Sequence, residues 1–424
     1  MFFTNLPRIE YAMLMKGRVS MPSRQSVRPW LVCLGGAIML FAVMGLGSNV
    51  YSVYQPYIIA QNGFTNTQAS WIITTRSLFI VLGMLTAGAL CRRFGVRRTA
   101  VGAMLLLALS RFLFGAAHSL PAYLGAAAIT GAAYSWGGMI PLSLLINSWF
   151  RDRNAFALGM ASAGSGLATI LFPGPITWLI QRWSLPAAFW CEGAFVLLLT
   201  LLVLVLVRDT PAQLGLHAYA QNTSPEEAPA PIVHPAPQGM TPLYWGMFLV
   251  AVFLTGAPTG IGISNVGVLY RTEGYTPGTA AALVSCVGLA LIAGKILYGE
   301  LADRLGGKLS SFLLYGVALA AYILLCLAPN GSQLCAFAAA ISFGLALPLS
   351  NVSYSIWSKD FLGDEGFASG LKWSQSLYAF GIVVFGPVPG WMADRTGSYV
   401  PSYLLFLVMM ALSFLLIALV YRRT

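Results

Sequence analysis

Long apolar stretches alternate with short polar connections along almost the whole chain. A stretch of roughly 20 mostly apolar residues can cross a bilayer as an α-helix, because the helix satisfies its backbone N–H and C=O groups internally. Twelve stretches meet this requirement: 30–52, 67–90, 99–117, 121–148, 155–180, 187–207, 243–265, 279–298, 309–328, 333–357, 369–390 and 401–421. The pattern therefore predicts an all-α polytopic membrane protein with twelve transmembrane helices.

Composition agrees with this pattern. Hydrophobic residues make up 58% of the 424 positions and charged residues only 9%, whereas about a quarter of the residues in soluble domains are charged. The net charge of +11 is spread over many short connections instead of forming one basic stripe, which argues against a nucleic-acid partner. We expect the lipid bilayer to be the main partner and the protein to be a monomer.

Most Lys and Arg residues lie in alternate connections. One set contains Arg92, Arg93, Arg97, Arg98, Arg151, Arg153, Arg208, Arg304, Lys308, Lys359, Arg422 and Arg423, and the other contains Arg182, Arg271 and Arg395. Basic loops resist translocation, so both termini are expected to be cytoplasmic. Compact loops favour the inner (plasma) membrane of a bacterium.

The longest polar stretch, 208–242, is rich in proline and contains Glu226 and Glu227. Such a composition cannot bury a core, and we expect a flexible cytoplasmic linker. It would separate a cytoplasmic segment (1–29) and an N-terminal six-helix half (30–207) from a C-terminal half (243–421) and a short cytoplasmic end (422–424).

The two halves repeat each other. The loop after the second span reads GALCRRFG from Gly88, and the loop after the eighth reads GELADRLG from Gly299, an offset of 211 residues (299 minus 88). Gly159 and Gly370 have the same offset, and Pro175 and Pro387 differ by 212. Such a duplication predicts two pseudo-symmetric halves with a solute site between them near the bilayer midplane.

These residues resemble the major facilitator superfamily, whose members are transporters with twelve spans in two halves. The resemblance rests on GELADRLGGK, its duplicated partner and the central linker. It implies a gating motif on the cytoplasmic side, formed by Gly88, Arg92, Gly95, Gly299, Asp303, Arg304 and Gly306. Arg92 departs from the family, which usually has an acidic residue there that helps to latch the halves together.

A narrower resemblance is to the oxalate:formate antiporters and monocarboxylate porters. It rests on the segment from Trp149 to Gly166, on RDTPAQLGL after the sixth span and on ADRTGSY before the twelfth. Those families bind substrate with an arginine in the eighth span, and Lys295 stands in a similar context four residues before Gly299. A snorkelling lysine is the equal alternative, and Lys372 is not assigned as a second binding cation.

Arg76 lies deep in the second span, where a charged side chain costs roughly 2.5 to 3.5 kcal/mol and usually has a function or a partner. A guanidinium facing a cavity could bind a carboxylate through two parallel donors, and a structural arginine bonded to carbonyls is the alternative. Aromatic and polar residues on neighbouring spans complete the expected substrate site: Tyr54, Tyr134, Asn265, Tyr354 and Trp373.

Other ionisable residues change this picture little. Arg111 and Glu192 lie near span ends, where we expect them to anchor the protein at the membrane interface. Monocarboxylate porters have an acid one turn before the eighth-span arginine, and Leu291 occupies that position here. With no carboxylate clearly at mid-membrane, the sequence favours exchange or uniport over tight proton symport.

The sequence thus predicts a secondary transporter that moves a small organic anion, a mono- or dicarboxylate, by alternating access, as an exchanger or an ion-coupled porter. A transporter of a neutral or drug-like solute is the first alternative, and a transport-dead sensor is the second. No hydrolase, nucleotide-binding or metal-ligand motif occurs, so no enzyme activity, cofactor or metal is expected.

Overall fold

The computed structural model of the chain describes residues 24–150, 154–219, 241–350 and 352–423. Within these ranges the protein is helical and contains no strand. Twelve helical stretches are long and apolar enough to cross a membrane, which confirms the predicted fold class. Most of the expected N-terminal segment (1–29) and linker (208–242), together with residue 424, lies outside the described ranges.

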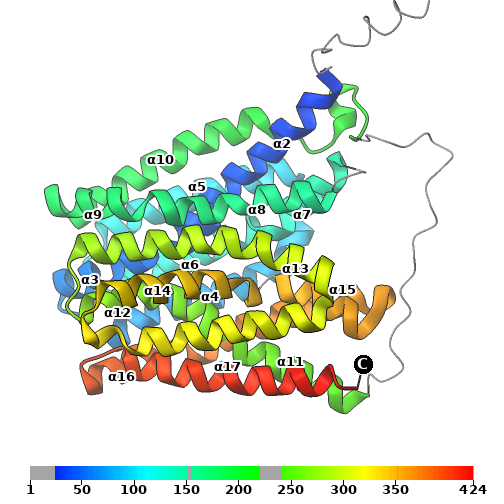
Figure 1. Ribbon diagram of the computed structural model, residues 1–424. Coiled ribbons are helices and arrows are strands. Elements are labelled where there is room, and N and C mark those ends of the chain that lie inside the picture. Colours follow the sequence, from blue (N-terminus) through cyan, green and yellow to red (C-terminus); the bar gives the residue numbers. More distant parts are fainter. Residues whose placement is uncertain (1–23, 151–153, 220–240, 351, 424) are drawn as a thin grey trace, which may run out of the picture.

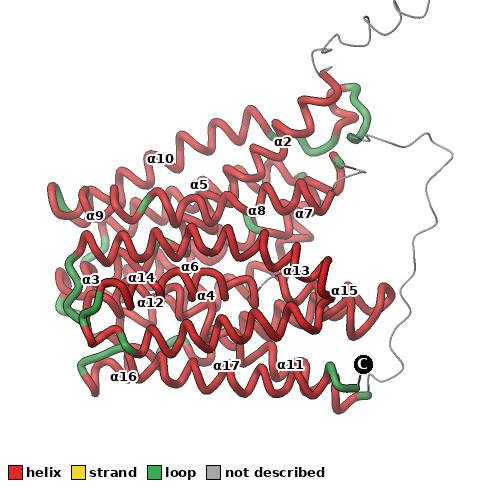
Figure 2. Tube along the Cα trace, viewed as in Figure 1, coloured by secondary structure: helices red, strands yellow, loops and turns green. Residues whose placement is uncertain are grey.

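Six of these spans form the N-terminal half. They are built from α2 (Arg24–Leu40), the π-helix η2 (Phe41–Asn49), α3 (Tyr51–Asn62), α4 (Asn66–Phe94), α5 (Val96–Ala116), α6 (Leu120–Trp136), α7 (Met139–Trp149), α8 (Asn154–Leu171), α9 (Pro173–Arg182) and α10 (Leu185–Leu206). A short 3₁₀-helix, η3 (Pro211–Leu214), follows α10. The tube in Figure 2 shows how short the loops between these helices are.

The C-terminal half contains the other six spans. Its helices are α11 (Pro242–Gly256), the π-helix η4 (Ala257–Ile261), α12 (Gly262–Thr272), α13 (Pro277–Cys326), η5 (Ala328–Asn330), α14 (Gln333–Ala346), η6 (Leu347–Ser350), α15 (Val352–Phe385), α16 (Val388–Thr396) and α17 (Val400–Val420). In Figure 1 the helices run side by side, with α10 and α2 along one edge of the bundle and α17 and α11 along the other.

Glycines divide the two longest helices. The backbone of Gly306 has φ 78° inside α13, and that of Gly363 has φ 65° inside α15. Residues other than glycine rarely adopt such backbone angles, so each glycine allows a turn between two spans. The loop glycine of the first half, Gly95, has φ 86°, so the duplicated loops share this backbone feature.

The first span is longer than its apolar stretch predicts. The sequence indicated an end near residue 52, whereas the span reaches Asn62. The extra turns contain Gln55, which is fully buried. Its side-chain amide donates a hydrogen bond to Asn265 of the other half, 3.1 Å away, and this bond offsets the cost of burying a polar group. A polar residue that has a partner inside the protein does not end a span.

We call the end of the bundle that carries Arg92, Arg97, Arg304 and Arg422 the basic face, and the other end the opposite face. The hydrogen bonds that join the two halves through described residues lie at the level of Arg76 or nearer the opposite face. Helices also approach closely there: a Cβ atom at Gly267 would lie 2.6 Å from the carbonyl oxygen of Ser52. The structure therefore shows the conformation in which the opposite face is closed.

Asp394 makes the densest of these contacts. This residue near the end of α16 accepts hydrogen bonds from the backbone N–H groups of Asn66 and Thr67 at 2.7 and 2.8 Å, and from the side chains of both residues. Asn66 and Thr67 form the first turn of α4, where N–H groups lack helical partners and the helix dipole favours a negative charge. A carboxylate of one half thus caps a helix of the other.

Replacing Asp394 by Asn should loosen the opposite face. The amide keeps only one acceptor oxygen and loses the charge, and charge-assisted bonds contribute roughly 1.5–3 kcal/mol each. We expect the labelling of a cavity cysteine, introduced by Ser77→Cys, to become about tenfold faster when a membrane-impermeant maleimide is added at the opposite face.

The matched control is Asp360→Asn, because Asp360 accepts a hydrogen bond from Tyr421 within the same half. An equal rate of labelling in the Asp394→Asn variant and its parent would show that Asp394 does not hold the halves together.

Candidate functional site

A central cavity of about 110 Å³ lies between the halves. The N-terminal half contributes Met44, Ser48, Asn49, Arg76, Ser77, Ile80, Met84, Tyr134 and Ser165 to its wall, and the C-terminal half contributes Thr259, Gly260, Ile263, Leu291, Lys295, Leu347, Ser350, Tyr378, Ala379 and Ile382. The wall combines apolar side chains with a few polar groups, as is typical of small-molecule sites.

Arg76 extends from α4 into this cavity, and only 5% of its surface is exposed. One terminal nitrogen donates a hydrogen bond to the hydroxyl of Ser264 in the other half at 3.1 Å. The other terminal nitrogen lies 3.5 Å from the carbonyl oxygen of Ser48, and the guanidinium carbon lies 5.4 Å from the centre of the Tyr51 ring. Arg76 therefore has hydrogen-bond acceptors but forms no ion pair with another described residue.

Lys295 reaches the same cavity from α13. No acid or hydrogen-bond acceptor of the described chain acts on its ammonium group. Leu291, one turn earlier on the helix, also lines the cavity, so no carboxylate at that position compensates the lysine. The sequence left two alternatives for Lys295, a cation at the substrate site and a lysine that snorkels to the membrane interface. The structure places its side chain at the cavity.

Tyr134 is the third of the expected residues that the structure brings to the cavity. The other four lie elsewhere: Tyr54 donates a hydrogen bond to Glu192, Asn265 accepts one from Gln55, Tyr354 shares one with Thr255, and the Trp373 side chain is 50% exposed on the surface of α15. In this conformation these four side chains pack within one half, join the halves or face outward, and they do not line the cavity.

Tyr378 lines the cavity and was missed by sequence reasoning. It lies on the same helix as Trp373, five positions further on, so the two side chains point in directions about 140° apart at 3.6 residues per turn. Its hydroxyl group interacts with Thr259 and Ser350, two other residues of the cavity wall. The alternation of apolar and polar residues on α15 does not reveal which side faces the other half.

The duplicated loops lie at the basic face. Gly88 and Arg92 belong to the last turns of α4, and in the second loop Arg304 forms an exposed ion pair with Glu300, one helical turn before it. Gly299 has no neighbour near its Cβ position, and the side chain of Asp303 lies outside the described structure. The predicted latch at Asp303 therefore stays a prediction.

Asp209 supplies an acid near the first loop, where Arg92 replaces the expected one. Its carboxylate accepts a hydrogen bond of 2.6 Å from the backbone N–H of Arg97 in the first turn of α5. Asp209 belongs to the RDTPAQLGL segment after α10, and both residues are part of the N-terminal half. This contact therefore orders the loop within one half and does not join the two halves.

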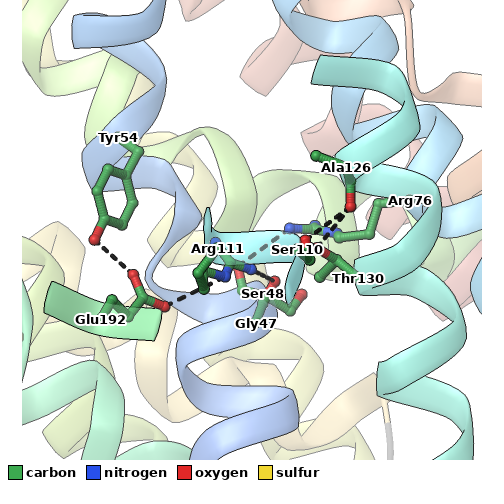
Figure 3. Close-up of polar contacts among 9 residues, drawn as sticks. All are labelled: Gly47, Ser48, Tyr54, Arg76, Ser110, Arg111, Ala126, Thr130 and Glu192. Carbon is green, nitrogen blue, oxygen red and sulfur yellow. Dashed lines mark hydrogen bonds and ion pairs between the residues drawn. The ribbon is translucent and has the colours of Figure 1, made fainter. Parts of the chain in front are cut away.

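Arg111 and Glu192 form a buried ion pair, so the expectation that both anchor the protein at the interface was wrong. Their side chains are 1% and 2% exposed, and Arg111 Nε lies 3.5 Å from Glu192 Oε1. Tyr54 donates a hydrogen bond of 2.5 Å to the other carboxylate oxygen. The three residues lie on α5, α10 and α3, which pack together inside the N-terminal half (Figure 3).

One wide turn of the first span connects the ion pair to the cavity. Arg111 donates a hydrogen bond of 3.2 Å to the carbonyl oxygen of Gly47, and the next carbonyl, that of Ser48, faces Arg76. Both residues belong to η2, whose π-helical hydrogen bonds run from i to i+5. Figure 3 shows the two guanidinium groups on either side of this turn.

Comparison with known proteins agrees with this fold. The sequence pattern of the Major Facilitator Superfamily matches residues 36–372. Monocarboxylate transporter 13 of Bos taurus is 27% identical over 383 residues, which cover 88% of this chain and 85% of that protein. The uncharacterized MFS-type transporter YhjX of Escherichia coli (strain K12) is 27% identical over 291 residues, which cover 67% of this chain and 68% of that protein.

A solved structure of the nucleoside transporter NupG superposes with a TM-score of 0.70 at 13% sequence identity, and the match covers 92% of this chain and 98% of that one. At this identity the likeness concerns the fold alone. The matched family pattern spans most of the chain, the twelve spans and the two halves are those of the family, and its members move solutes rather than catalyse reactions. The chain therefore belongs to the Major Facilitator Superfamily and is a multi-pass membrane transporter of a small molecule.

Proposed function

We propose that this transporter carries a small organic anion, a mono- or dicarboxylate, by alternating access between the two halves. The observation that carries the proposal is that Arg76 and Lys295, one from each half, line one cavity, and that neither forms an ion pair with a described residue. A buried charge without a counter-ion is costly, and a bound carboxylate would supply the missing charge. The Bos taurus relative is named a monocarboxylate transporter, which agrees with this substrate class.

The geometry also supports a link between the binding of the substrate and the movement of the two halves. Arg76 is bonded to Ser264 across the boundary between the halves, so an anion that draws the guanidinium toward Lys295 competes with that bond. Tyr134 and Tyr378 add hydroxyl groups from the two halves. Binding would thus replace contacts between the halves by contacts to the substrate.

Sidedness and gating belong to the same proposal. The basic face is cytoplasmic, as the bias of Lys and Arg in the short loops indicates, and the membrane is the bacterial inner membrane. The protein works as a monomer, and the duplicated loops around Gly88 and Gly299 close the basic face in the other conformation. The domain limits remain those expected from the sequence.

A neutral solute is the second candidate. Met44, Met84, Ile263, Leu347 and Ile382 make much of the cavity wall apolar, and the fold is shared with a protein named as a nucleoside transporter. In that case Arg76 would serve only to hold Ser264 and Ser48, and its removal would weaken the protein without changing which solutes it selects.

Replacing either cation by Ala should strongly reduce carboxylate transport. We expect saturable uptake of labelled carboxylates into proteoliposomes by the wild type, from a panel of oxalate, formate, lactate, pyruvate and succinate, with neutral sugars and amino acids for comparison. Arg76→Ala and Lys295→Ala should each reduce kcat/KM for the transported acid about 10- to 100-fold, because charge-assisted bonds contribute roughly 1.5–3 kcal/mol.

The control is Arg422→Ala, which removes an exposed cation at the end of the chain. Uptake of neutral solutes only, or unchanged carboxylate uptake in both cavity variants, would contradict the proposal.

Tyr378 and Trp373 test the cavity against the expectation from sequence. Tyr378→Phe should raise KM for the transported carboxylate about three- to tenfold, since a hydrogen bond contributes about 0.5–1.5 kcal/mol. Trp373→Ala should leave KM unchanged, because this side chain faces away from the cavity. The opposite result would place the binding site along the other side of α15.

A further inference from the structure

Glu192 is the only fully buried carboxylate among the described residues, with 3% of its surface exposed. It lies within the span Leu185–Leu206, away from the cavity that holds Arg76 and Lys295. A carboxylate inside a membrane span is expensive to bury, and the substrate site described above does not use it. Its presence therefore calls for a separate role.

Few groups act on this carboxylate. Arg111 faces it from α5 and Tyr54 faces it from α3, and the remaining helices packed on α10, namely α2, α9 and η2, bring no charged or titratable described group to it. The ion pair is also incompletely bonded: Arg111 Nε and Nη1 and Glu192 Oε1 lack hydrogen-bond partners. The environment thus stabilises the charged carboxylate mainly through one arginine.

The protonation state of Glu192 changes the net charge close to Arg76 at the substrate site. Arg111 and Arg76 bond to adjacent carbonyl oxygens of η2, those of Gly47 and Ser48, and a narrow gap lined by both arginines and Tyr51 separates them. With Glu192 ionised, Arg111 is neutralised; with Glu192 protonated, Arg111 becomes a second uncompensated cation near Arg76. Like charges in a protein interior repel each other, and an anion bound at Arg76 relieves this repulsion.

We propose that Glu192 is a proton-binding site that couples proton movement to anion transport. This inference rests on the proposed function. One proton adds to a carboxylate oxygen of Glu192 and gives the neutral acid, no other bond is made or broken, and the anion that binds at Arg76 balances the charge left on Arg111. Because coupling between two sites is reciprocal, the proton and the anion each raise the affinity for the other, by about tenfold.

The burial of the site fits coupled transport. In this conformation Glu192 is enclosed by protein, and Tyr54 is its nearest hydroxyl group. A proton can then be exchanged with water only when the helices around α10 move, so it does not leak across while the halves stay in one conformation. Such a site favours proton symport, whereas the sequence, with no carboxylate clearly at mid-membrane, favours exchange or uniport.

The test compares wild type, Glu192→Gln and Glu273→Gln in proteoliposomes with labelled lactate and labelled oxalate. Gln keeps the size of the side chain and removes the proton site, and Glu273 provides the same substitution outside the cavity and the gating loops, where it accepts a hydrogen bond from Ser398 of the same half. Two quantities are measured for each protein. One is the rate of anion exchange without a pH gradient, and the other is the ratio of inside to outside anion concentration when the outside is more acidic by about two pH units. Protein-free liposomes give the background of passive entry.

We expect wild type and Glu273→Gln to concentrate lactate, by up to about tenfold per pH unit when one proton moves with each monoanion, as follows from the tenfold change in proton activity. Glu192→Gln should exchange the anion and fail to concentrate it. Accumulation by Glu192→Gln equal to that of wild type, or wild-type exchange that ignores the gradient, would overturn the coupling and leave anion transport standing. Absence of carboxylate exchange in all three proteins would instead remove the proposed function itself.

A second measurement does not depend on transport by the variant. Adding lactate or oxalate to purified wild-type protein in weakly buffered detergent should cause uptake of protons, read with a pH indicator. Glu192→Asp keeps a titratable group and the charge, so it should retain this proton uptake. It replaces Glu192→Gln in the comparison where that variant fails to fold. Binding of the anion without proton uptake by the wild type would also overturn the proposal.

Discussion

Two buried guanidinium groups are held by neighbouring carbonyl oxygens of one wide helical turn in the first span. A regular α-helix uses its carbonyl oxygens for its own i to i+4 bonds, whereas a π-helical segment distorts this pattern and is often found at functional sites. Gly47 and Ser48 accept from Arg111 and Arg76 there. The position of Arg76 in the cavity, its bond to Ser264 and the burial of Glu192 all depend on this turn.

The arrangement divides the charges of the protein by function. On the opposite face, Asp394 uses its carboxylate to cap a helix of the other half, and this contact belongs to one conformation of the transport cycle. In the cavity, Arg76 and Lys295 come from different halves and have no counter-ion among the described residues. Inside the N-terminal half, Glu192 neutralises Arg111. Each of these buried or interfacial charges is thus either paired within the chain or placed where a substrate can pair with it.

Periodicity and duplication predicted the twelve spans, the two halves and the cavity cation Arg76, because these depend on the length of apolar runs and on the cost of burying a charge. The Arg111–Glu192 pair could not be predicted in this way. Each residue lies near the end of its own span, and only the packing of α5 against α10 shows that they face each other. Tyr378 was missed for a similar reason, since the side of a helix that faces a partner half is set by tertiary structure.

The two π-helical segments occupy corresponding places in the repeat: Leu46 of η2 and Ala257 of η4 differ by the same 211 residues as the loop glycines (257 minus 46). A wide turn contains one residue more than an α-helical turn of the same rise, so it acts as an insertion absorbed without unwinding the helix. Deleting one residue from a regular span rotates everything beyond it by about 100°. A deletion within η2 or η4 would restore α-helical geometry and keep the register, so these spans can change length over evolution while their neighbours cannot.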